Sequence, residues 1–565
     1  MVIIMIKNMN IKKIMIIFVL LLFIFLAIRI AGLNSPLYDD EVDHLLSKYN
    51  PQAFGLNPHS TKPPLISWMN LLFSHTFGDE IWKFRGLMVL FGMSTLILTF
   101  LLSKKLYQNN KAALISTTIM GFSFYHILGS LQVGSYMVLA FFYLVFFMSY
   151  LHYKSTGKKK FLIASGIVWG LALLLRESAV LMLLIVGIYE LLDIIKKKDW
   201  KLIVNKTKII LPILLIGGAM FSIFPLLNHL ASLPLVDHVV GNVGKRLKPG
   251  FSLMGFSMFL FWSTPFLVGL FSISAIKGFK EKNNKLPLIW FFTVFLFYII
   301  LIPILGDFST YFVNLIIPMS LVSGYFLSKI KWKTKYWWMG GIVFILANLM
   351  FNRLNKGVLE YVPRFMDLYL SRLMNFDWNF LFTYTGSSGP LFFFSFKAIM
   401  IAYIISTILI IYFFVFKDKK AKQYFLVIFI AFSFAFNVGV AQEYLFHTNH
   451  PDPGEAINNF VDYYEINKGQ LIKPYYTNNV AMLFYLDRYY LLDLNGKNEK
   501  YYYMGVYGEY MEKVKKLTEQ KGGTVFLLAH PPTPKDSPLW DVADSCELKK
   551  EFKSKGKTFV FIFEC

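Results

Sequence analysis

The sequence predicts an α-helical polytopic membrane protein that ends in a small external α/β domain. Of its 565 residues, 56% are apolar, and the mean hydropathy is +0.51. Soluble domains are nearer 45–50% apolar. The apolar residues also form blocks of roughly 17–25, which is long enough to span a hydrocarbon core of about 30 Å. Because the bilayer offers backbone groups no other partner, these blocks are predicted to be helices.

Thirteen transmembrane helices are expected, and the connections between them indicate their direction. The apolar runs begin near Ile14, Leu87, Ala112, Ser135, Phe161, Val180, Ile209, Leu253, Leu286, Tyr311, Tyr336, Phe392 and Tyr424. Every second connection is short and rich in lysine, namely 1–13, 104–111, 153–160, 196–208, 277–285, 329–335 and 417–422. Together these seven hold 28 lysines and three acidic residues, as cytoplasmic loops do. The chain is therefore predicted to be a multi-pass cell-membrane protein with a cytoplasmic N-terminus and an extracytoplasmic C-terminal domain.

Two of these spans need separate argument. The apolar stretch 161–195 is interrupted by Arg176 and Glu177. As one helix it would be about 52 Å long, so two short helices that turn outward near Arg176 are predicted. The first span is interpreted as an uncleaved anchor, since no small-residue cleavage site follows it before Pro36.

The net charge of +23 lies entirely in the membrane part of the chain. From residue 442 onward, 15 Lys and Arg stand against 17 Asp and Glu. A nucleic-acid-binding protein would instead gather its basic residues on a soluble face. We therefore expect no nucleic-acid partner and expect membrane lipid to surround the basic part.

Two domains are predicted, a transmembrane domain over 1–441 and a soluble one over 442–565. The first has long external connections at 33–83, 229–252 and 352–391, and loops of this length are usually functional. In the second, Asp452-Pro453-Gly454-Glu455 predicts a helix start with an Asp N-cap and a capping box. Strands are expected at 489–494, 524–529, 547–552 and 558–563, with a helix at 507–520.

The two cysteines, Cys546 and Cys565, flank the last two predicted strands. Their midpoint falls between Lys555 and Gly556, where a turn is expected. A hairpin centred there places the cysteines opposite each other, close enough for a disulfide, and an external compartment permits one. The alternative is two free thiols. Two cysteines do not make a zinc site.

Residues that suit chemistry gather in the first external loop. Four carboxylates (Asp39, Asp40, Glu41 and Asp43) follow the first span, and Lys62 and Arg85 come later. Paired carboxylates suit a general base, because one raises the pKa of another. Lys62, which Pro63-Pro64 holds in place, and Arg85 suit a phosphate group. The alternative is a solvated acidic loop.

The order of these motifs carries a resemblance. A first span is followed by DE at 40–41, KPPL at 62–65, FG at 77–78 and Arg85, and the segment 306–327 places Tyr311 before Pro318. This pattern resembles the GT-C membrane glycosyltransferases, namely protein O-mannosyltransferases and the aminoarabinose transferase of lipid A. The resemblance implies a GT-C-like fold with an external C-terminal domain.

The resemblance also implies a mechanism. Asp40 matches the family's catalytic aspartate, with Glu41 beside it, and would take the proton from an acceptor hydroxyl on a protein or lipid. That hydroxyl would displace the phosphate of a polyprenyl-phosphate-linked sugar and invert the anomeric carbon. No cofactor would be required. The leaving phosphate would need cations, for which Lys62, Arg85 and Arg176 are the candidates.

Arg176 interrupts an apolar run, where a charge costs at least about 2.5 kcal/mol at the bilayer centre. Its alternatives to phosphate contact are an ion pair with Glu177 and a snorkelling interface anchor. Lys245 and Arg246 form a second candidate pair for phosphate, or else a solvated loop pair. The sequence departs from the family at 129–142, which carries no charge, and at Asp307, where the family has Lys.

Other functions stay open at this point. External histidines, including His447 and His450, leave a divalent metal as an alternative, and an oligosaccharyltransferase-like enzyme would need one. A transporter would place charges near the bilayer midplane and often shows internal repeats, and no repeat is visible. A non-catalytic scaffold would not need Asp40, Lys62 and Arg176 on one face.

Overall fold

The computed structural model describes residues 11–35, 41, 45, 63–78, 80–198, 202–231, 260, 265–301, 313–330, 332, 335–356, 371–383, 393–467, 469–472, 475–477, 501–503, 522–528 and 546–565. The chain forms two compact units. The membrane unit comprises 1–33, 52–353 and 399–441, and the tail unit comprises 34–51, 354–398 and 442–565. The tail unit thus adds two segments to 442–565. One lies within the predicted external loop 33–83, and the other covers most of the loop 352–391 and extends to residue 398.

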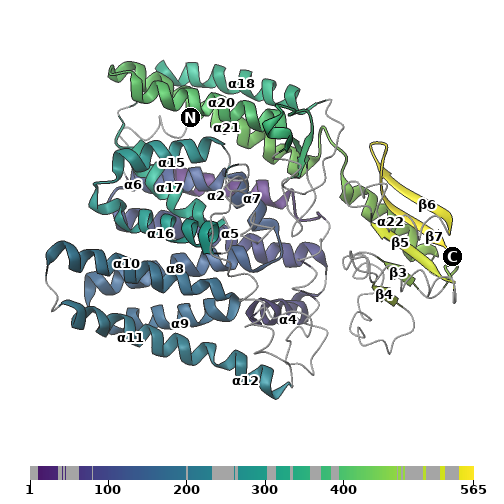
Figure 1. Ribbon diagram of the computed structural model, residues 1–565, viewed down its shortest axis with the longest axis horizontal. Coiled ribbons are helices and arrows are strands. Elements are labelled where there is room, and N and C mark those ends of the chain that lie inside the picture. The colour runs from purple at the N-terminus through teal and green to yellow at the C-terminus, as the bar shows by residue number, and fades with distance from the viewer. Residues whose placement is uncertain are drawn as a thin grey trace. The chain divides into compact units, whose positions relative to one another are not determined.

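The membrane unit consists of helices, many of which run side by side, as α5, α8, α9 and α11 do (Figure 1). They are α2 (Ile11–Ile30), α4 (Leu65–Phe77), α5 (Ile81–Tyr107), α6 (Asn110–Gly121), α7 (Phe124–Leu131), α8 (Ser135–Thr156), α9 (Lys159–Leu175), η3 (Glu177–Ala179), α10 (Val180–Lys197), α11 (Leu202–Phe221), α12 (Ile223–Leu230), α15 (Pro265–Gly278), η4 (Lys282–Asn284), α16 (Lys285–Leu296), η5 (Phe297–Leu301), α17 (Val313–Ser328), α18 (Lys335–Asn355), α20 (Phe396–Val415) and α21 (Lys419–Phe446).

Each of the thirteen predicted runs overlaps one of these helices, although Leu253, Tyr311 and Phe392, near which three of the runs begin, lie outside the described residues. Among the described residues, eight helices are long and apolar enough to cross a membrane, or nine if the bent pair α6 and α7 is one span. The remaining predicted spans correspond to helices of 17 residues or fewer (α9, α15 and α17) and to the more polar α18. The predicted helical membrane fold is confirmed, although fewer than thirteen helices meet that criterion in the part of the chain that the structure describes.

Four of the seven lysine-rich connections contact one another in pairs at one end of the membrane unit. Lys105 Nζ donates to Ser155 Oγ at 2.9 Å, which joins the connections 104–111 and 153–160. Lys329 pairs with Glu281, which joins 329–335 to 277–285. We call this end the lysine end. Its composition is that of a cytoplasmic face.

The predicted break at Arg176 is present. Helix α9 ends at Leu175, Arg176 is extended, and α10 begins at Val180 after one turn of 3-10 helix. A broken helix leaves carbonyl groups that need donors in a membrane. The Trp169 indole supplies one of them, because it donates to the carbonyl of Ala179 at 3.0 Å.

The tail unit contains a five-stranded mixed sheet with α22 (Pro453–Asn467) against it. The strand order is β4-β3-β5-β7-β6, from β3 (Tyr475–Thr477), β4 (Tyr501–Tyr503), β5 (Thr524–Leu528), β6 (Glu547–Ser554) and β7 (Lys557–Glu564). A separate hairpin pairs β1 (Leu381–Thr383) with β2 (Phe393–Ser395). The predicted strand at 489–494 and the predicted helix at 507–520 lie outside the described residues.

Helix α22 starts at the predicted place with a modified cap. Asp452 Oδ1 accepts from the Gly454 amide at 2.8 Å, as an N-cap does. The expected bond from the Asp452 amide to Glu455 is replaced by a bridge. That amide donates to Ser554 Oγ at 3.0 Å, and Ser554 in turn donates to Glu455. The cap therefore also joins α22 to β6.

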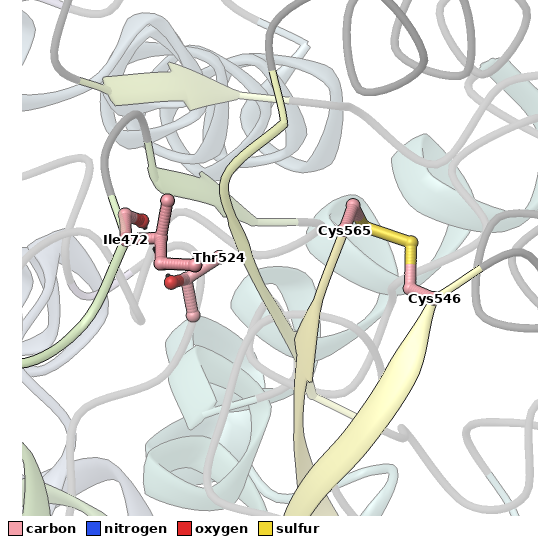
Figure 2. Close-up of a disulfide and its surroundings, with 4 residues drawn as sticks. All are labelled: Ile472, Thr524, Cys546 and Cys565. Atoms are coloured by element: carbon pink, nitrogen blue, oxygen red, sulfur yellow. Dashed lines mark hydrogen bonds between the residues drawn. A yellow bond between two sulfur atoms is a disulfide. The ribbon is translucent and has the colours of Figure 1, made fainter.

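The C-terminal hairpin turns at Lys555 and Gly556, both with positive φ. The register is shifted once on each strand, and the two shifts cancel, so Glu547 faces Glu564. Cys546 and Cys565 therefore lie opposite each other and form a disulfide, with Cα atoms 4.5 Å apart (Figure 2). The Cys565 amide donates to Gly523 O at 2.9 Å, which joins the end of β7 to the start of β5.

Candidate active site

Two of the predicted arginines meet at one connection, at the end of the membrane unit opposite the lysine end. Arg85 lies near the start of α5, is fully buried, and donates to the carbonyl of Leu131 at the end of α7. Arg176 donates to Ser135 Oγ at 2.8 Å, and its guanidinium lies 4.3 Å from the ring centre of Tyr136 on α8. The connection between α7 and α8 therefore holds both arginines.

This connection lies within the uncharged segment 129–142, where the sequence departs from the family. Its residues are buried, and Gln132 is only 4% exposed. A carbonyl and a hydroxyl position an arginine through hydrogen bonds but bring no negative charge to it. The connection therefore orients the two guanidinium groups.

The KPPL motif leads into the same neighbourhood. Pro63 and Pro64 are buried, and α4 starts directly after them. Leu65, the last residue of the motif, packs against a buried pair formed by Leu174 and Phe224. Leu174 is two residues before Arg176, so the motif ends beside the break in the α9–α10 hairpin.

A buried polar network that was not predicted from the sequence contacts α7 and the bend before it. Arg29, in the last turn of α2, is fully buried and contacts Nδ1 of His126 at 2.6 Å. It also donates to the carbonyl of Gly121 at 3.3 Å, at the bend between α6 and α7. Among the described residues it has no carboxylate partner. Intramembrane arginines are rare and usually serve a function, so an arginine in the apolar run 11–30 was a usable signal.

The hydrogen bonds of this network determine the state of the imidazole. Nδ1 of His126 accepts from Arg29, so Nε2 carries the proton and donates to Thr95 Oγ1 at 2.8 Å. Thr95 donates onward to the carbonyl of Gly92 at 2.7 Å. A Cβ at Gly92 would lie 2.3 Å from Ser130 Oγ. Only glycine therefore lets α5 approach α7 this closely.

The remaining predicted site residues are less fully described. Asp40, Lys62, Lys245 and Arg246 lie outside the described residues. Glu41 is described as a fully buried residue of the tail unit. Asp307 and Tyr311 also lie outside the described residues, whereas Pro318 is inside α17.

The histidines flagged at the start of the tail belong to a second missed network, centred on Glu443. This carboxylate is 1% exposed and accepts from the amide of His450 at 2.9 Å and from Asn355 Nδ2 at 3.2 Å. His450 Nε2 lies 3.0 Å from Asn355 Oδ1, which also accepts from the Ser395 amide. Burial lowers the pKa of His450, although Glu443 opposes the shift.

Each of the two histidines uses its Nε2 atom in a contact with a neighbouring side chain. Asn355 engages the Nε2 of His450, and His447 Nε2 lies 3.4 Å from Asp452. Within the described ranges, no group of three or more His, Cys, Asp or Glu residues is placed to hold a metal ion. The contacts of both histidines thus lie within the tail unit.

Comparison with known proteins identifies the architecture. Residues 61–225 match the family of dolichyl-phosphate-mannose-protein mannosyltransferases. ArnT from Cupriavidus metallidurans bound to undecaprenyl phosphate is similar over 97% of both chains, with a TM-score of 0.58 and 14% sequence identity. The chain has a GT-C glycosyltransferase fold. The apo structure of the same ArnT matches with a TM-score of 0.55 and 13% identity, again over 97% of both chains. No curated protein sequence matches significantly.

The GT-C resemblance inferred from the motifs is thereby confirmed. The matched segment 61–225 contains the KPPL motif, Arg85, the connection between α7 and α8, and Arg176. The part of the chain that carries the family signal is thus the part that brings the two arginines together.

Proposed function

We propose that this GT-C protein transfers a sugar from a polyprenyl-phosphate donor to a protein or lipid hydroxyl on the non-cytoplasmic side of the membrane. The observation that supports the proposal best is that Arg85 and Arg176 bind the two ends of the same connection, between α7 and α8. Two oriented guanidinium groups at a membrane surface suit a lipid-linked phosphate. The ArnT structure of similar fold holds undecaprenyl phosphate.

In the proposed reaction Asp40 is the general base, and Glu41 lies next to it in sequence. The acceptor hydroxyl gives its proton to the Asp40 carboxylate, and its oxygen bonds to the anomeric carbon. The bond from that carbon to the phosphate oxygen breaks, and polyprenyl phosphate leaves with the electron pair. Attack opposite the leaving group inverts the anomeric centre. Arg85 and Arg176 stabilise the negative charge that grows on the phosphate.

The test uses the purified full-length protein with a panel of labelled polyprenyl-phosphate sugars and acceptors. The Asp40→Asn variant should lose transfer by at least about 100-fold, since general-base catalysis contributes roughly 10²–10⁴-fold. Asp462→Asn, an exposed carboxylate of the tail unit, is the matched control and should transfer at the wild-type rate. Equal turnover in wild type and Asp40→Asn would remove Asp40 from its role. Solute flux into liposomes without any transfer would favour a transporter.

A further inference from the structure

A cavity of about 590 Å³ opens at the lysine end, between α15, α17, α20 and α21. Its lining includes four lysines that come from three of the predicted cytoplasmic connections, namely Lys277, Lys329, Lys419 and Lys422. Glu281 is the one carboxylate among the described lining residues, and it pairs with Lys329. Four lysines and one glutamate leave the lining with a net charge of +3.

The walls of this cavity are partly aromatic, and the lysines lie against them. Lys422 Nζ is 5.6 Å from the ring centre of Phe413, which is itself buried. Lys329 Nζ is 4.1 Å from the ring centre of Tyr325, which also lines the cavity. Contacts of this kind hold a flexible ammonium group near the ring. The site therefore offers positive charge beside an apolar wall, which suits an amphiphilic anion.

One buried polar atom in the lining lacks a partner. Asn284 is 2% exposed, and its Nδ2 donates to the carbonyl of Gly278 at 3.1 Å. Its Oδ1 accepts no hydrogen bond within the part of the chain that the structure describes. A buried acceptor left without a donor is unfavourable. A ligand in this cavity is therefore expected to bring a hydroxyl as well as an anion.

We propose that this cavity binds the headgroup of an anionic glycerophospholipid, with its phosphate among Lys277, Lys419 and Lys422 and a headgroup hydroxyl donating to Asn284. Basic pockets between transmembrane helices on the cytoplasmic side are suited to such headgroups. A lysine-rich loop that serves only to orient the protein in the membrane needs positive charge. Such a loop needs neither a cavity nor a buried hydrogen-bond acceptor, and both are present here. The site lies at the end opposite Arg85 and Arg176 and does not depend on sugar transfer.

The test is equilibrium binding of labelled phosphatidylglycerol to the full-length protein in micelles of an uncharged detergent. Each lysine should contribute about fivefold in affinity. Replacing Lys277, Lys419 and Lys422 together by Gln should therefore weaken binding about 100-fold. The matched control replaces three exposed lysines of the same end that lie outside the cavity lining, namely Lys104, Lys158 and Lys159. It should change the affinity less than about twofold.

Two further arms separate the possible ligands. Phosphatidylcholine, which has no net charge and no headgroup hydroxyl, should compete poorly. Asn284→Leu should reduce the preference for phosphatidylglycerol over phosphatidic acid, because the acceptor for the hydroxyl is gone. Equal weakening by both lysine triples would overturn the proposal in favour of general surface attraction. Competition by free glycerol phosphate at the same concentration would overturn the lipid as ligand and assign the cavity to a soluble anion.

Discussion

At the lysine end of the membrane unit, Lys154 pairs with Glu190 and Lys329 with Glu281. At the other end, Arg29 and Arg85 donate to main-chain carbonyls that lie far away in sequence. Both kinds of contact join distant segments, but the lysines bind carboxylates whereas the arginines bind main-chain carbonyls. Positive charge at the first end is enough to orient a membrane protein. At the second end the planar, multiply donating guanidinium group is what matters.

The largest effect is expected at Arg176. Arg176→Gln removes the cation that lies between Ser135 and Tyr136. If this cation stabilises the leaving phosphate, transfer should fall about 100- to 1000-fold, the loss typical of one oxyanion-stabilising donor. Turnover with a labelled polyprenyl-phosphate sugar measures it. Arg353→Gln, an exposed arginine of α18, is the control and should leave the rate unchanged.

A second substitution at Arg176 separates the effect of its positive charge from the effect of its planar guanidinium group. Arg176→Lys keeps a positive charge but lacks the planar group that lies on Tyr136. If geometry matters as the comparison of the two ends implies, this variant should recover only part of the rate. If Arg176→Lys recovered the full transfer rate, a positive charge alone would suffice at Arg176. The proposed difference between the lysines of one end and the arginines of the other would then be wrong.

The next effect concerns stability and Arg29. Arg29→Gln shortens the side chain and leaves the Gly121 carbonyl and His126 Nδ1 without their donor. A buried polar group left unpaired costs about 1–3 kcal/mol. We expect unfolding of the purified protein in mixed micelles to become easier by an amount in this range. A surface change away from such contacts is usually within about 0.5 kcal/mol, so a loss no larger than that would contradict the role given to Arg29.

How much of the fold and the site could be predicted from the sequence depends on how far apart in the chain the residues that form each feature lie. The break at Arg176 was predictable, because a charged pair in an apolar run is a local feature. The hairpin of Cys546 and Cys565 was predictable as well, since register follows from counting residues about a turn. The loops that lie at the lysine end were predicted from charge alone.

The arginine network was not predictable in the same way. Arg29 and His126 are 97 residues apart, and Arg85 is 46 residues from Leu131. Such contacts depend on how helices pack, which a periodic pattern does not specify. The connection between α7 and α8 attracted attention only for its lack of charge. Its backbone and hydroxyl groups, which sequence motifs do not record, are what hold the arginines.

The smallest effect is expected at Glu190, on the lysine end. Glu190 is 1% exposed and accepts from the Tyr150 hydroxyl and from Lys154 Nζ at 2.7 Å. Glu190→Gln keeps an acceptor for the hydroxyl but loses the charge that attracts Lys154. Since Lys154 is about a third exposed, solvent screens the pair, and the loss of stability should be about 1 kcal/mol or less. Sugar transfer should stay at the wild-type rate, because this pair lies at the far end from Arg176. A fall in transfer as large as that of Arg176→Gln would mean that the two ends act as one site.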